Sequence, residues 1–207
     1  EIASDPIGGE WLVRTFALEL VQPLSVRSEI GPRRQTVHAA DQRKEVHQEH
    51  MRPAPSLQGH LTFMLKHEGV HLELLARLFE RIDPQQLAAW VHAEPNGQYA
   101  RRAGFFYEWL TQRALPIEDG LVGGNYVDAL NPEHQMVATT RLSVGRWRVR
   151  DNMPGNSDFC PTVRLTPAIR AALQFDLARA LDREEARFGA EILRTSAVGM
   201  TLRESRA

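Results

Sequence analysis

A single helical period runs through the stretch from Ser56 to Ile82 and constrains the fold more than any other feature of the chain. With successive residues about 100° apart, its large apolar side chains share one arc, and they are Leu57, Leu61, Met64, Leu65, Leu72, Leu75, Phe79 and Ile82. Lys66, Glu73 and Arg77 take the opposite face. The spacing predicts one continuous amphipathic core helix, so a helical layer forms the centre of the expected fold.

Shorter patterns of the same kind predict further helices on both sides of this stretch. They cover residues 7–20, 83–92 and 98–112, and a last one runs from Thr166 towards the C-terminus. Asp83-Pro84 and Thr166-Pro167 each combine an N-capping side chain with a proline suited to the first helical position. The aromatic side chains of 98–112 are expected to pack in the core.

Two stretches lack a helical period. Residues 21–55 hold four prolines and a basic-polar run, which indicates a long ordered loop or a β-like excursion. Residues 115–165 are punctuated by glycine and proline, and the alternation over 146–150 predicts a short strand. The expected fold class is therefore mainly α, a helical domain with an irregular, partly β-stranded middle segment. The expected parts are an N-terminal helical region at 1–114, the middle segment at 115–165 and a C-terminal helix at 166–207.

The charge balance and the cysteine count exclude several functional classes. With 25 lysine and arginine residues against 26 acidic ones the net charge is -1, so no overall field draws the chain to nucleic acid or an anionic membrane. The single cysteine, Cys160, excludes an internal disulfide and a thiolate zinc cluster, and we expect a buried structural thiol. No apolar run approaches the ~18 residues of a membrane helix. These features predict a cytoplasmic protein with no membrane partner.

Residues 67–71 read His-Glu-Gly-Val-His and match the H-E-x-x-H spacing of zinc hydrolases. On a continuous helix this spacing places two imidazoles on one face as zinc ligands, with the glutamate as general base. A third ligand is not identified, because His60 lies roughly 10 Å along the helix axis from His67, too far to share one ion. A zinc-dependent hydrolase with ligands His67 and His71 and base Glu68 is one alternative function.

The helical wheel favours a structural role for Glu68. With Leu57 at zero, Glu68 falls inside the apolar arc, where a carboxylate must be paired or neutralised. On the helix expected over 98–112, Arg102 falls among the aromatic residues. We predict that Glu68 is buried and forms an ion pair with Arg102 between the two helices.

Four arginines flank Trp147 and form a small basic and aromatic strip, namely Arg141, Arg146, Arg148 and Arg150. Such strips hold single-stranded nucleic acid or a nucleotide phosphate, so a nucleic-acid-binding module is the second alternative function. Basic side chains on a strand edge also protect it from pairing with other chains. We favour this solvated edge, and nucleic acid is not among the expected partners.

Several strings of the chain carry a family resemblance. They are GHLTFMLKHE at 59–68, YARR at 99–102 followed by YEWLT at 107–111, GNYVDAL at 124–130, RVRDN at 148–152 and DFCP at 158–161. These strings resemble the N-terminal region of bacterial Fic-family proteins (filamentation induced by cyclic AMP). The resemblance runs through most of the chain. It implies a region that precedes the catalytic Fic core, an all-α domain that typically transfers AMP from ATP to a hydroxyl side chain of a target protein.

The resemblance does not extend to the catalytic core. The catalytic loop of that family reads H-P-F-x-D/E-G-N-G-R, with the histidine as general base and the acidic residue holding magnesium, and no histidine here is followed by Pro-Phe. We therefore assign no catalytic, cofactor-binding or metal-binding residue, and ATP and magnesium are implied only for the core. The resemblance implies the Fic core in cis as a partner, with a target protein and a second copy of the chain as further candidates.

Both ends of the chain fit this resemblance. The chain begins at Glu1 rather than a methionine, and residues 201–207 resemble the segment that leads into the family's Ser-Phe-x-x-Glu-Gly inhibitory helix. We expect a piece of a larger protein, cut just before that helix. The predicted function is a non-catalytic N-terminal regulatory or docking region of a Fic-type protein adenylyltransferase.

Overall fold

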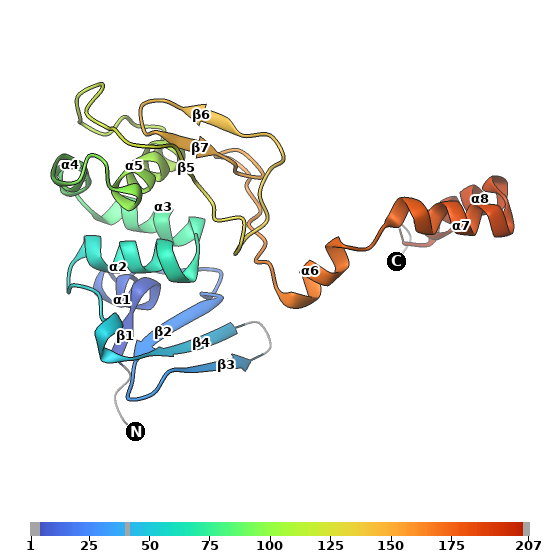
Figure 1. Ribbon diagram of the computed structural model, residues 1–207, viewed down its shortest axis with the longest axis horizontal. Coiled ribbons are helices and arrows are strands. Elements are labelled where there is room, and N and C mark those ends of the chain that lie inside the picture. The colour runs from blue at the N-terminus through green and yellow to red at the C-terminus, as the bar shows by residue number, and fades with distance from the viewer. Residues whose placement is uncertain (1–4, 40–41, 205–207) are drawn as a thin grey trace. The chain divides into compact units, whose positions relative to one another are not determined.

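The computed structural model describes residues 5–39 and 42–204. The chain divides into two compact units, Glu1–Arg164 and Leu165–Ala207 (Figure 1). The first unit thus takes in nearly all of the two regions that the sequence treats separately at 1–114 and 115–165. It contains two small sheets with a helical layer, and each unit is described by itself below.

A four-stranded sheet occupies the N-terminal part of the first unit. Its strands are β1 (Asp5–Ile7), β2 (Val26–Ile30), β3 (Gln35–Ala39) and β4 (Gln42–His47), in the order β1-β2-β4-β3. The β2–β4 pair is parallel and the other pairs are antiparallel. On β2, Val26 and Ser28 are buried whereas Arg27 is exposed, which is the alternation of a half-buried strand. Helix α1 (Gly8–Thr15) lies against β2, and a 3-10 turn (Glu49–Met51) follows β4.

The predicted fold class, mainly α, is therefore wrong. The structure is helix-rich but mixed α/β, with 46% of residues in helices and 14% in strands. The sequence left residues 21–55 open between a long ordered loop and a β-like excursion, and it predicted no sheet because the strands are short and polar and bury little apolar surface. Charged side chains pair across them instead: Lys44 on β4 lies 2.8 Å from Glu29 on β2.

The helical layer follows the sheet along the chain and holds most of the core. It comprises α2 (Leu57–Phe63), a π turn (Met64–Glu68), α3 (Leu72–Arg81), α4 (Pro84–Ala93) and α5 (Gln98–Thr111). The helices predicted over 83–92 and 98–112 are confirmed as α4 and α5, whereas the helix predicted from Ser56 to Ile82 is broken in two. Fully buried Leu61, Leu74 and Phe106 join these helices in one hydrophobic cluster.

A three-stranded sheet covers part of α5. Its strands are β5 (Val127–Asp128), β6 (Leu142–Val144) and β7 (Val149–Asp151), in the order β5-β7-β6. Trp147, in the turn between β6 and β7, is fully buried, and its indole Nε1 donates a 2.6 Å hydrogen bond to Glu108 on α5. Gly104 of α5 leaves the space for this ring, since a Cβ there would collide with it. Trp147 thus anchors the sheet to the helical layer, together with the ion pair between Arg146 and Glu108.

The second unit consists of helices alone in its described part, which ends at Glu204. They are α6 (Pro167–Leu173), α7 (Leu177–Phe188) and α8 (Ala190–Glu204), and α7 packs against α8. The predicted Thr166 cap is confirmed, because its side chain accepts a hydrogen bond from the backbone N–H of Ile169. Several large apolar side chains of this unit remain exposed, among them Leu177, Leu181 and Phe188. No helix within the described ranges is both long and apolar enough to span a membrane.

Candidate functional site

The H-E-x-x-H segment lies at a sharp break between α2 and α3 rather than on one helix. The π turn ends at Glu68, and Gly69 then takes a φ of 96°, a left-handed conformation that favours glycine. His71 begins the next helix as its N-cap, with Nδ1 accepting a 3.1 Å hydrogen bond from the backbone N–H of Leu74. Each histidine therefore belongs to a different helical segment.

This break removes the geometric basis of the zinc alternative. His67 packs against Phe63 and lies 6.3 Å, ring to ring, from His47, whereas Nδ1 of His71 is engaged in capping α3. Burial lowers the pKa of both His67 and His71. Within residues 5–39 and 42–204, no three His, Cys, Asp or Glu side chains gather as metal ligands. Among the described residues, the spacing that suggested a zinc site is therefore not matched by a set of three ligands.

Glu68, the last residue of the π turn, caps the N-terminus of α1. Its burial was predicted and is confirmed, since the residue is 8% exposed. Oε2 accepts a 2.8 Å hydrogen bond from the backbone N–H of Gly9, while the backbone N–H of Gly8 donates to Nδ1 of His60 at 3.1 Å. The two N–H groups at the start of α1 are thus satisfied by one side chain from α2 and one from the π turn. Gly8 has a φ of 62°, and a Cβ on it would collide with the Glu68 carboxylate.

The buried carboxylate is incompletely compensated. Oε1 of Glu68 and Oγ of Ser28, although neighbours, both lack a hydrogen-bond partner of good geometry. Burial raises the pKa of Glu68 to about 7, against the opposing effects of Ser28 and the Gly9 N–H. Burial likewise lowers the pKa of His60 to about 4, which keeps its imidazole neutral and able to accept. The two side chains that cap the start of α1 therefore have pKa values shifted in opposite directions.

The predicted ion pair between Glu68 and Arg102 does not form. Arg102 is buried, as its place among the aromatic residues suggested, but its guanidinium donates to the carbonyls of Ala129 and Leu65. The Leu65 carbonyl needs a donor because the helix is interrupted just beyond it. The partners of Arg102 are thus backbone carbonyls, one at the break and one just after β5, and not the predicted carboxylate.

Two further residues hold the break, and neither was singled out from the sequence. Gln135 pairs with Val70 on both sides, accepting from its N–H at 2.8 Å and donating to its carbonyl at 3.0 Å. Arg164 donates a 2.8 Å hydrogen bond to the Glu68 carbonyl. These partners are 65 and 96 residues away from the groups they bind, so no local pattern points to them.

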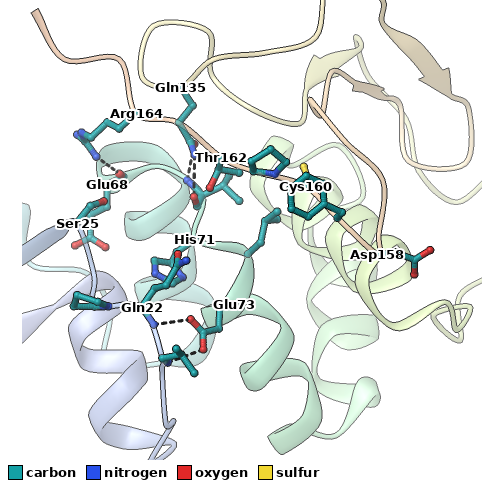
Figure 2. Close-up of a pocket in the computed structure, with 16 residues that line it drawn as sticks. Gln22, Ser25, Glu68, His71, Glu73, Gln135, Asp158, Cys160, Thr162 and Arg164 are labelled. Atoms are coloured by element: carbon teal, nitrogen blue, oxygen red, sulfur yellow. Dashed lines mark hydrogen bonds between the residues drawn. The ribbon is translucent and has the colours of Figure 1, made fainter. Parts of the chain in front are cut away.

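A cavity of about 720 Å³ opens beside the break (Figure 2). His71, Glu73 and Arg164 line it together with Cys160. Most of its polar side chains support its walls: Glu73, for example, accepts from the backbone N–H groups of Val21 and Gln22. Cys160 is half-buried rather than fully buried, and burial raises the pKa of its thiol. The arrangement favours a structural cavity over one with an activated thiolate.

The arginine strip is largely neutralised by acidic partners. Arg146 pairs with Glu108 and with Asp119, and Arg150 lies 2.6 Å from Asp128. Trp147 is buried, so its ring is not available for stacking on a base. The nucleic-acid alternative therefore loses the exposed aromatic group and most of the free charge on which it depended.

We expect Gln135→Ala to lower the free energy of unfolding by about 1.5 kcal/mol, because it leaves the buried N–H and carbonyl of Val70 without partners. Urea denaturation followed by circular dichroism measures this loss. Gln86→Ala, at an exposed glutamine on α4, is the matched control and should change stability by less than ~0.5 kcal/mol. Equal effects of the two substitutions would show that Gln135 does not hold the break.

Comparison of the chain with protein-family models, with curated proteins and with solved structures finds no match.

Proposed function

We propose that the chain is a non-catalytic N-terminal regulatory or docking region of a Fic-type protein adenylyltransferase from the bacterial cytoplasm. In this proposal the parent enzyme transfers AMP from ATP to a protein hydroxyl group. ATP and magnesium would be held by the catalytic core, whose His-Pro-Phe loop does not occur in these residues. The family is proposed from the sequence resemblance alone. A scaffolding role is supported by the hydrogen bonds that the resembling strings make with one another.

The resembling strings bind one another inside the first unit. Arg102 joins the string at 99–102 to Leu65 and to Ala129, which belong to two other strings. Asn152 exchanges two hydrogen bonds with Leu130, at 2.8 and 2.9 Å. Because these polar groups form hydrogen bonds within the first unit, we infer that they stabilise its fold and do not act on a substrate.

An exposed apolar stripe on α7 carries the docking role. Leu177, Leu181 and Phe188 fall within about 40° of one another on the helical wheel, and they are 61%, 52% and 45% exposed. A helix with such a stripe is stabilised when a folded partner covers it. In this proposal the partner is the Fic core in cis.

The decisive experiment reads the coding sequence beyond codon 207 and assays AMP transfer. We expect an in-frame H-P-F-x-D/E-G-N-G-R loop, transfer of α-phosphate-labelled AMP to protein by the longer polypeptide, and none by the 207 residues alone. A stop codon directly after Ala207 would refute the cis arrangement. Stoichiometric zinc that is lost in His67→Ala would instead support the hydrolase alternative.

We expect Leu181→Ser to change the rate of AMP transfer by the longer polypeptide at least about threefold, because it weakens the contact between α7 and the core. Asp182→Ser, the adjacent exposed position on another face of α7, should leave the rate within about 1.5-fold and serves as the matched control. Equal rates for both variants would contradict a docking role for the α7 stripe.

A further inference from the structure

A second cavity, of about 310 Å³, is lined by residues of the π turn, the first turn of α5 and β5. Its lining includes Lys66, Arg102 and Arg150 together with Tyr99 and Tyr126. This volume is at the lower end of the range of ligand cavities, so only a small molecule or a small part of one fits inside. Leu65 and Lys66 are the residues of the π turn that line this cavity. It has no lining residue in common with the larger cavity of Figure 2.

Arg102 brings unused hydrogen-bond donors to this cavity. A guanidinium has five N–H donors. Nε and Nη2 both donate to the carbonyl of Ala129, at 3.1 and 2.7 Å, and Nη1 donates to Leu65 at 3.2 Å. One N–H on each Nη therefore has no acceptor among the described residues. Arg102 is only 6% exposed, and Asp128, the carboxylate whose charge acts on it, forms its ion pairs with Arg141 and Arg150 instead.

The charge of the lining is also unbalanced. Three cationic side chains face one carboxylate, Asp128, within the described part of the chain. That carboxylate is already bonded to Arg150 at 2.6 Å and to Arg141 at 3.5 Å. The charge of Asp128 acts on buried Arg102 without forming an ion pair with it, and Lys66 is exposed, so the lining keeps an excess of positive charge. A buried cation such as Arg102 normally has a counter-ion.

Neutral donors complete the site. Burial raises the pKa of Tyr99, so its phenol stays protonated and can donate a hydrogen bond. Phosphate monoesters carry nearly two negative charges and three acceptor oxygens, which matches two cations with several N–H and O–H donors. We propose that this cavity binds the phosphate group of a small phosphate monoester, held by Arg102 and Lys66.

The lysine content of the chain allows a direct test. The only two lysines are Lys44 and Lys66, and Lys44 is ion-paired with Glu29 on the N-terminal sheet. In NMR spectra of protein labelled with carbon-13 lysine, inorganic phosphate or phenyl phosphate should shift the Lys66 side-chain signal. The shift should saturate, with half-saturation at a ligand concentration of about 1 mM. Sodium chloride of equal ionic strength should not shift this signal. Parallel shifts of both lysines, or equal shifts with chloride, would overturn the site.

Matched variants test the role of Lys66 without disturbing the fold, since Lys66 is exposed. Lys66→Gln should weaken phenyl phosphate binding about fivefold by calorimetry, whereas Lys44→Gln should leave it unchanged. Unchanged binding in Lys66→Gln would overturn the assignment. A phosphoserine peptide should bind more weakly than phenyl phosphate because the cavity is small, and tighter binding of the peptide would refute a small-molecule ligand.

Discussion

Glu68→Gln should raise the free energy of unfolding by about 3 kcal/mol at about pH 8, an unusual outcome for a substitution at a buried hydrogen-bonded residue. The expectation rests on the pKa of Glu68, which burial raises from 4.5 to about 7. At about pH 8 the folded protein holds this group as a buried anion. Glutamine keeps an oxygen for the Gly9 N–H, and its amide group can donate towards Ser28, whose hydroxyl lacks a partner.

The pH dependence follows from the direction of each pKa shift. The folded pKa of Glu68 is raised, so its contribution to stability is fully present below about pH 4.5 and is lost as the pH rises through about 7. His60 has a lowered pKa of about 4, so its contribution is present above about pH 6.5 and is lost as the pH falls through about 4. Between these limits the two contributions oppose each other in the wild type. In Glu68→Gln only the loss at low pH remains.

Urea denaturation at about pH 5 and about pH 8 tests both statements. Glu80→Gln provides the control, because that carboxylate is exposed beside Arg77 and its neutralisation should change stability by less than ~0.5 kcal/mol at either pH. Loss of stability in Glu68→Gln at about pH 8 would mean that the ionised carboxylate stabilises the start of α1 more than its burial costs.

The burial of Glu68 could be predicted from the sequence, but its partner could not. The helical wheel places Glu68 among apolar residues, and that placement survives the break because the π turn keeps Leu65 and Glu68 facing the core. The N–H group that binds it belongs to Gly9, 59 residues earlier in the chain. A helix N-terminus can satisfy a carboxylate as an arginine can, and sequence spacing does not distinguish the two.

The sequence contains a sign of the break between α2 and α3, but the continuous apolar pattern argues against it. A glycine such as Gly69 is typical of the end of a helix, and His71, two residues later, is the N-cap of the next one. The apolar residues on either side, Leu65 and Leu72, nevertheless share one arc, so the wheel indicates continuity. The first sheet left a weaker signal, because Arg27, Glu29 and Lys44 alternate with few large apolar residues. Its strands are held by backbone pairing between segments whose register the sequence does not specify.

Trp147→Ala should lower the free energy of unfolding of the first unit by about 4 kcal/mol. Trp147 is fully buried, and its ring fills the space that Gly104 leaves on α5. The substitution removes this contact, leaves a cavity that the rigid sheet and helix can close only in part, and leaves Glu108 without the indole donor. The residue that suggested a nucleic-acid surface from the sequence is thereby expected to be the main link between the second sheet and the helices.

Two matched variants separate this structural role from the alternative. Phe159→Ala removes an aromatic ring that is 74% exposed and should change stability by less than ~0.5 kcal/mol in the same denaturation experiment. Gly104→Ala should lower the free energy of unfolding by ~1–3 kcal/mol, because the added methyl group collides with the Trp147 ring. The Gly104→Ala and Trp147→Ala effects should not add, since without the ring the methyl group has space. Additive losses would place Trp147 and Gly104 in separate environments and would refute the anchor.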